Sequence, residues 1–245
     1  MKGPQIAGFF LFATTELTMG AVVVDDLIAR LRQIEVSTLC DGDKTIPVVD
    51  PAVRALVPDV RMAGVARTVI AEDDHLAVLA ALAAAQAGDV LVIVTNGGQR
   101  AILGELVATE AVRRGVAGFV VDGYCRDVQG LRKLGLPVFA RGTYPASGSV
   151  VARTATDARV DCGGVEVSPG DIVFGDDDGV VIASAERVAA ALDVAEARAR
   201  AEAGVLAGIR RGVPLKDLTN YAEHLVALEQ GRASKMEFRP DADRG

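Results

Sequence analysis

Two kinds of hydrophobic pattern alternate in the middle of the chain. The runs Asp89–Val94 and Gly118–Asp122 are almost entirely aliphatic, which is typical of strands that are buried on both faces. Between them, Ala101–Arg114 has hydrophobic residues at helical spacing, and Gly115 follows as a helix-ending residue. A glycine loop, Thr95–Arg100, separates the first strand from this helix. The order strand, helix, strand predicts a βαβ unit with two parallel strands.

Further helices and strands are predicted on both sides of this unit from the same periodicities. They are an amphipathic helix at Asp25–Ile34, a strand at Gly64–Ile70, a helix at His75–Ala87, a strand at Val138–Ala140, hairpins around Gly163–Gly164 and Asp178–Gly179, and a long helix at Ala185–Arg211. The mixture of parallel strands, helices and hairpins predicts an α/β fold.

We expect three parts along the chain: an N-terminal extension over residues 1–20, a single α/β domain over residues 21–212, and a helical C-terminal tail over residues 213–245. The extension contains one apolar run, Ile6–Ala13, which is too short to cross a bilayer. It is either a targeting segment with a weak cleavage context or a segment outside the folded domain, and we expect the second.

Composition and charge narrow the classes of function. The chain has a formal net charge of -7 and a pI of about 5.0, which argues against a nucleic-acid surface because such surfaces are basic. Three widely spaced cysteines without a CxxC motif favour a reducing compartment, so we expect a cytoplasmic protein without a membrane partner. Only two histidines are present, so a metal would be held by carboxylates, which favours Mg²⁺ or Mn²⁺.

The strongest candidate site joins residues from two parts of the βαβ unit. Glu105 lies in the first turn of the predicted helix, and Arg126 and Asp127 follow the second buried strand. A parallel crossover brings these positions to one edge of the sheet, where ligands bind in open α/β folds. Arginine grips carboxylates bidentately and aspartate ligates hard cations. There are two simpler alternatives. Arg126 and Asp127 could form a surface ion pair, and Glu105 could be an acidic residue that the helix dipole favours in the first turn.

Other polar features have simpler explanations. The glycines of the Thr95–Arg100 loop match no nucleotide-binding motif, so the loop either binds an anion at the helix start or forms a tight turn. The segment Asp176–Gly179 lacks the alternate ligand spacing of a calcium loop and is expected to be a hairpin turn. Cys125 is expected in the core, and His75 and Tyr124 in the core or at its rim.

Three motifs together resemble the RraA-like family, which includes class II pyruvate aldolases. They are Gly97-Gly98-x-Arg100-Ala101-x-x-Gly104-Glu105-Leu106, Gly115-x-x-Gly118, and Asp122-Gly123-x-x-Arg126-Asp127. The similarity extends to Gly88–Val92, Pro169–Asp171 and Asp178–Val181, and covers approximately residues 25–212. The aldolases of this family act on 4-hydroxy-4-methyl-2-oxoglutarate and 4-carboxy-4-hydroxy-2-oxoadipate.

The resemblance implies an αββα sandwich of the swivelling β/β/α type, assembled as a homotrimer or homohexamer. It implies a Mg²⁺ or Mn²⁺ ion held directly by Asp127 and through water by Glu105. It also implies that Arg126, with the amides around Gly104, Glu105 and Leu106, binds the 2-oxo acid substrate. A helix glutamate of a neighbouring subunit completes such sites, and Glu202 is its best match here.

The chain differs from the aldolases at two positions near the site. They carry aspartate where this chain has Glu105, and an acidic residue where it has Gly130. The family also contains inhibitors of ribonuclease E in which the Arg-Asp pair is disrupted, whereas Arg126-Asp127 is intact here. We therefore expect a metal-dependent lyase that cleaves a 4-hydroxy-2-oxo acid or decarboxylates oxaloacetate. The alternatives are a non-enzymatic regulator that binds a protein partner and another metal-enolate reaction in a biosynthetic pathway.

Overall fold

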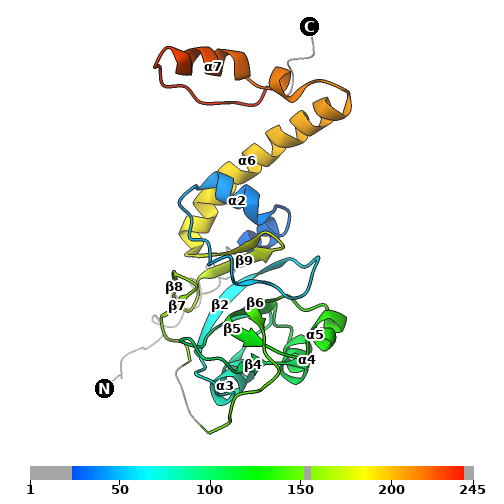
Figure 1. The fold of residues 1–245 in the computed structure, drawn as a ribbon, viewed down its shortest axis with the longest axis vertical. Helices are drawn as coiled ribbons and strands as arrows, with labels where there is room; N and C mark the ends of the chain where they lie inside the picture. Colours follow the sequence, from blue (N-terminus) through cyan, green and yellow to red (C-terminus); the bar gives the residue numbers. More distant parts are fainter. Residues whose placement is uncertain (1–23, 152–155, 240–245) are drawn as a thin grey trace, which may run out of the picture. The chain divides into compact units, whose positions relative to one another are not determined.

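The computed structural model describes residues 24–151 and 156–239, and its ribbon is drawn in Figure 1. The N-terminal extension predicted over residues 1–20 lies outside these residues. The chain divides into two compact units. One comprises the described parts of Met1–Ser37 and Thr45–Ala189, and the other comprises Thr38–Lys44 and the described part of Ala190–Gly245.

The first unit is built on a mixed sheet. Its strands, in spatial order, are β1 (Arg54–Ala55), β6 (Val138–Thr143), β5 (Gly118–Cys125), β3 (Asp89–Val94), β2 (Met62–Ile70), β9 (Ile172–Asp176) and β10 (Gly179–Ala183), and β4 (Ala101–Leu103) also pairs with β5. The four neighbours β6, β5, β3 and β2 are mutually parallel. Their carboxyl ends therefore meet at one edge of the sheet.

The central strands are buried on both faces, as their aliphatic runs predict. In β3, Leu91 and Ile93 belong to one hydrophobic cluster, and Val90, Val92 and Val94 belong to the other. This division follows from the alternation of side chains along a strand. Each face of the sheet therefore has its own core.

Different elements cover the two faces. On one face lie three helices, α3 (Leu76–Ala84), α4 (Glu105–Arg114) and α5 (Val128–Leu134), which contribute alanines and leucines to the first cluster. On the other lies a small antiparallel sheet of β7 (Val160–Cys162) and β8 (Val165–Val167). Gly163 and Gly164 form its turn at φ +56° and +78°, where glycine carries no Cβ penalty.

The second unit is helical. It contains most of α2 (Val36–Gly42) and α6 (Ala185–Arg210), a 3₁₀ turn η1 (Leu215–Leu218) and α7 (Tyr221–Glu229). Arg198 on α6 contacts two other segments of this unit. Its Nε lies 3.1 Å from a carboxylate oxygen of Asp41, and its guanidinium lies 5.5 Å from the ring centroid of Phe238. No helix in the described part of the chain is long and apolar enough to span a membrane.

The predicted start of one helix is wrong. The pattern placed a helix over Ala101–Arg114, but Ala101–Leu103 form β4 and α4 begins only at Glu105. All three residues of β4 are fully buried, and the strand pairs in parallel with the end of β5. The glycine loop at Thr95–Arg100 therefore precedes a strand, and Gly104, not the loop, caps the helix.

Candidate functional site

The carboxyl ends of the parallel strands converge on one cavity of about 310 Å³. The segment after β2 contributes His75 and Leu79, β4 leads into the start of α4, β5 leads into Arg126 and Asp127, and β6 leads into the loop at residues 144–151. This edge is where open α/β sheets bind ligands.

Arg126 and Asp127 lie side by side at the end of β5. The Nε atom of Arg126 is 3.5 Å from Oδ2 of Asp127, and both side chains are about two-fifths exposed. Asp127 adopts φ +58°, a left-handed conformation that aspartate, asparagine and glycine tolerate better than other residues. The turn directs the residue back towards α4, because Oδ2 accepts a hydrogen bond from the backbone N–H of Glu105 at 3.2 Å.

Two glycines leave room for the carboxylates of this site. A Cβ atom on Gly104 would lie 2.5 Å from Oδ2 of Asp127. A Cβ atom on Gly130, in the first turn of α5, would lie far inside van der Waals contact with the carboxyl group of Glu105. The Glu105 carboxyl group therefore occupies the space above Gly130, and Asp127 occupies the space above Gly104.

The structure brings together most of the residues predicted from the sequence. Gly104, Leu106, Arg126 and Asp127 line the cavity, and Glu105 is joined to Asp127 through its amide. Because the Glu105 N–H is engaged in this way, the neighbouring Leu106 amide is the next N–H at the helix start. Leu106 itself is 84% exposed.

Glu202 lies in the helical unit rather than in the unit that carries the cavity. Its carboxylate accepts a hydrogen bond from Arg198 Nε at 3.3 Å, one turn earlier on α6. The expected contribution of Glu202 to a neighbouring subunit's site stays a prediction.

His75 was assigned by the sequence only to the core or its rim, yet it lines the cavity. Its Nδ1 is 3.0 Å from the carbonyl oxygen of Ile102, and its backbone N–H donates to the carbonyl of Ser149. His75 follows shortly after β2 and so lies at the same sheet edge as Arg126. The sequence could have placed it there only if the strand order, with β2 beside β3, had been known.

The donor set of the site fits a hard divalent cation. Among the described residues no group of three or more His, Cys, Asp and Glu side chains is arranged to hold a metal. Asp127 and Glu105 nevertheless offer two carboxylates, and Mg²⁺ is usually held by one or two carboxylates with water and substrate oxygens. Zinc sites use three or four protein ligands, so this arrangement suits Mg²⁺ or Mn²⁺ better.

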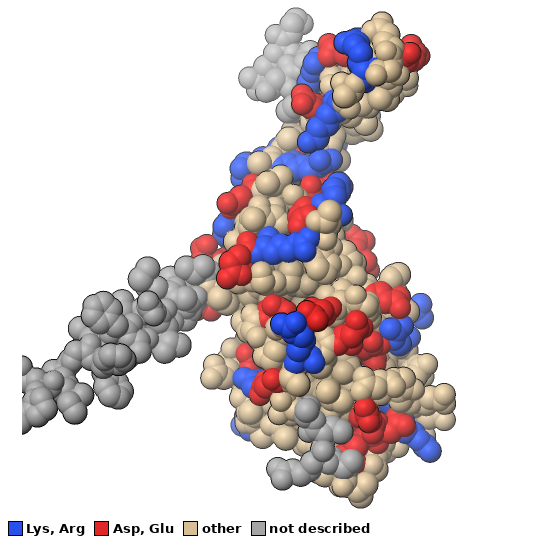
Figure 2. Space-filling view, turned by 90° about the vertical axis from the view of Figure 1, so that its left-hand side faces the viewer, with Lys and Arg blue, Asp and Glu red and all other residues tan. Residues whose placement is uncertain are grey.

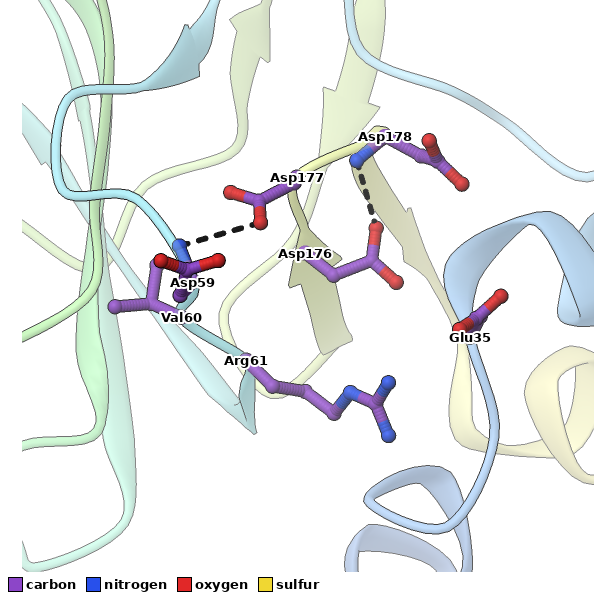
Figure 3. A pocket seen from close by; sticks show the side chains of 7 residues that line it. All are labelled: Glu35, Asp59, Val60, Arg61, Asp176, Asp177 and Asp178. Carbon is purple, nitrogen blue, oxygen red and sulfur yellow. Dashed lines mark hydrogen bonds between the residues drawn. The ribbon is translucent and has the colours of Figure 1, made fainter.

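A larger cavity of about 540 Å³ lies elsewhere in the first unit and is lined mainly by acidic side chains (Figure 3). Two of its aspartates stabilise the local structure: Asp176 accepts hydrogen bonds from the N–H groups of Val36 and Asp178, and Asp177 accepts one from the N–H group of Asp59. The segment is the turn of the β9–β10 hairpin, as predicted. Size alone does not make this cavity the site, because Asp59, Val60 and Arg61 directly precede β2 and the cavity therefore lies away from the carboxyl edge where open α/β sheets bind ligands.

Cys125 is the last residue of β5 and is fully buried. Burial raises the pKa of its thiol well above the ordinary value, because the charged thiolate would be poorly solvated. Cys125 is therefore a core residue and not a nucleophile, although it directly precedes Arg126.

On the face drawn in Figure 2, acidic and basic residues are interspersed rather than gathered by sign.

Comparison with known proteins agrees with this architecture. A family model described as RraA-like, Aldolase/RraA, matches residues 36–182. A protein of Halalkalibacterium halodurans with the provisional name 4-hydroxy-4-methyl-2-oxoglutarate aldolase is 38% identical over 159 residues, which cover 64% of this chain and 76% of that protein. A Burkholderia multivorans protein with the same provisional name is 34% identical over 153 residues, covering 60% and 93% of the two chains.

Among solved structures, the fold is similar to Streptomyces coelicolor RraAS2, described as an unusual member of the RNase ES inhibitor RraA protein family. The TM-score is 0.64 with 31% sequence identity, and the match covers 72% of this chain and 93% of that one. The fold and the matched region together define the class: the chain belongs to the RraA-like family. The α/β fold expected from that resemblance is confirmed.

Proposed function

We propose that the chain is a divalent-metal-dependent lyase that cleaves the C3–C4 bond of a 4-hydroxy-2-oxo acid and releases pyruvate. Decarboxylation of oxaloacetate is proposed as a second reaction of the same site. The observation that carries the proposal is the juxtaposition of Arg126, Asp127 and the start of α4 in one cavity. The provisional aldolase names of two relatives support it.

Arg126 binds the carboxylate of the 2-oxo acid through its planar guanidinium, which matches a carboxylate bidentately. It also stabilises the negative charge that develops on the keto oxygen as the C–C bond breaks. The N–H groups at the start of α4 carry partial positive charge, which stabilises the same developing negative charge. The backbone that carries these groups is held in place before the substrate arrives, because β4 is fully buried and pairs with the end of β5.

Asp127 and Glu105 would hold the metal, Asp127 directly and Glu105 through water. A bound Mg²⁺ or Mn²⁺ supplies Lewis acidity to the substrate's keto and carboxylate oxygens. Glu105 has a second proposed task, to take up the proton of the C4 hydroxyl through a water molecule. The absence of a side chain on Gly130 leaves the room that this carboxyl group occupies.

We further propose that the chain associates with copies of itself as a trimer or hexamer, with Glu202 supplied to a neighbour's site. The competing function is that of a regulator that binds a protein partner, which the similarity to RraAS2 favours. A regulator needs no chemistry from Arg126 and Asp127, so the two functions differ in their dependence on these residues and on metal.

Metal removal tests the proposal. Protein stripped with EDTA should lose pyruvate release and oxaloacetate decarboxylation, and addition of Mg²⁺ or Mn²⁺ should restore both, because none of the described residues that line the cavity is a lysine that could form a Schiff base in place of a Lewis acid. Activity that persists in stripped protein would contradict the metal-dependent mechanism. No activity towards any 2-oxo acid with metal present would favour the regulator.

A further inference from the structure

His75 is a cavity residue to which the proposed function gives no task. It directly precedes α3, and it lines the same cavity as Gly104, Arg126 and Asp127. The proposed reaction leaves an electron pair on C3 of the departing pyruvate, and this carbon must take up a proton. Imidazole both gives and takes protons near neutral pH, so His75 has the chemistry that this step requires.

The backbone around His75 is held firmly. Its N–H donates to the carbonyl oxygen of Ser149 at 2.9 Å. The preceding residue, Asp74, is 1% exposed, and its carboxylate accepts hydrogen bonds from the Ser149 hydroxyl at 2.6 Å and the Val151 amide at 2.7 Å. The start of α3 and the loop after β6 are therefore tied together, and His75 occupies a fixed position in the cavity wall.

The His75 ring has one nitrogen engaged with the protein. Its Nδ1 lies 3.0 Å from the carbonyl oxygen of Ile102, and because a carbonyl oxygen only accepts, Nδ1 carries a hydrogen. Nε2 is then the nitrogen that gains or loses a proton. No other hydrogen bond of this ring is present within the described residues. The Ile102 contact therefore orients the ring and leaves Nε2 for a ligand.

Ile102 links the His75 ring to the site at the start of α4. It is the middle residue of β4, and three residues later Glu105 begins α4 and donates its N–H to Asp127. Three residues of chain span roughly 11 Å at most, so the Cα atoms of Ile102 and Glu105 lie within that distance. The cavity that His75 and Asp127 share has a volume of about 310 Å³, which is at the small end of ligand sites in proteins.

Other groups of the site are poorly suited to deliver a proton to C3. Among the described residues that line the cavity, the remaining side chains that bear a dissociable proton or a charge are Arg126, Asp127 and Ser147. Arginine does not release its proton in proteins, a serine hydroxyl does not ionise near neutral pH, and Asp127 is the proposed metal ligand. Glu105 is assigned to the C4 hydroxyl. Glu202 of a neighbouring subunit is the competing donor.

We propose that His75 transfers the proton at C3 of pyruvate. This inference rests on the proposed lyase function and names a further catalytic residue of that site. When the C3–C4 bond breaks, its electron pair moves to C3, and the imidazolium Nε2–H donates its proton to that carbon. The neutral ring then regains a proton from water. In the reverse direction, neutral Nε2 removes a proton from the methyl group of pyruvate, and neither direction needs an oxidant or a reductant.

Exchange of the C3 protons of pyruvate for deuterium isolates this step, because no C–C bond breaks. His75→Asn keeps a donor for Ile102, since the asparagine amide nitrogen takes the place of Nδ1, but nothing replaces Nε2. With Mg²⁺ in D₂O, exchange followed by NMR should slow by about 10²-fold or more. The melting temperature and the Mg²⁺ affinity measured by calorimetry should stay parental. His224→Asn is the matched control, because it makes the same change in the helical unit, and it should exchange as the parent does.

The histidine ring resonances give a second readout that needs neither turnover nor a folded His75 variant. The chain has only two histidines, so His224→Asn assigns both sets of signals. Oxalate with Mg²⁺ resembles the enolate of pyruvate in shape and charge, and it should shift the Nε2 resonance of His75 but not that of His224. A His75 resonance that does not respond to bound oxalate would contradict the inference.

The outcomes separate this inference from the proposed function. Exchange at the parental rate in His75→Asn overturns the inference, and loss of exchange in Glu202→Gln instead assigns the proton to the neighbouring subunit. Loss of Mg²⁺ affinity or of stability together with exchange in His75→Asn also overturns it, since His75 would then serve the metal or the fold. Absence of both exchange and cleavage in the parent overturns the proposed function, and the inference with it.

Discussion

At the scale of single residues, glycines determine where the carboxylates of the site lie. Gly104 and Gly130 face Asp127 and Glu105, and a methyl group at either position would enter the space of the facing carboxyl group. The atoms displaced at Gly130 are at the end of a flexible side chain. A substitution there therefore moves Glu105 without disturbing the backbone.

Gly130→Ala should consequently separate activity from stability. Alanine is better than glycine in a helix by about 1 kcal/mol, so the melting temperature should stay constant or rise. Turnover should fall by about tenfold or more, because the proton acceptor is displaced. In a Glu105→Ala background the same substitution should have no further effect on turnover. A parallel loss of stability and activity would show that Gly130 matters for folding and not for Glu105.

At the scale of elements, the sequence predicted what depends on local pattern. The strands at Asp89–Val94 and Gly118–Asp122 were predicted because aliphatic runs are typical of strands buried on both faces, although the second strand extends to Cys125, and the hairpins were predicted from their glycine turns. The split of Ala101–Arg114 into a strand and a helix was not, since β4 exists only through its pairing with β5. The place of Glu105, Arg126 and Asp127 followed from the βαβ crossover, whereas His75 required the order of the whole sheet.

The junction between β5 and α5 depends on the left-handed conformation of Asp127. Asp127→Asn should keep the stability of the parent, because asparagine tolerates positive φ. Asp127→Ala should lower the free energy of unfolding by about 1–2 kcal/mol, because alanine lacks the short polar side chain that lets aspartate and asparagine tolerate the left-handed conformation. Denaturant unfolding of the two variants checks this. Equal stability of Asp127→Ala and Asp127→Asn would contradict a conformational role for residue 127.

At the scale of the whole molecule, the helical unit leaves apolar side chains exposed. They include Val194, Leu206, Ile209, Leu215, Leu225 and Leu228. Where such side chains form one contiguous patch, the patch is typical of a surface that contacts another chain. It is consistent with the proposed self-association, in which Glu202 of the same unit reaches a neighbour.

Light scattering should therefore give a mass three or six times that of the 25.4 kDa chain. Replacing Leu206 and Ile209 with aspartate should lower that mass, because charge at a buried interface is costly. Val112→Asp, at an exposed apolar position of α4, is the control and should leave the mass unchanged. A monomer at micromolar concentration in the parent protein would refute the association.

One paired measurement tests most directly whether Asp127 holds the metal and Arg126 binds the substrate. Mg²⁺ binding by calorimetry and pyruvate release are compared for the parent, Asp127→Asn and Arg126→Lys. Asp127→Asn should lose Mg²⁺ affinity, because the charge is removed while the shape is kept. Arg126→Lys should bind Mg²⁺ as the parent does, with turnover lower by about 10²–10³, since lysine lacks the planar fork. Unchanged Mg²⁺ binding in Asp127→Asn, or parental turnover in Arg126→Lys, would contradict the account.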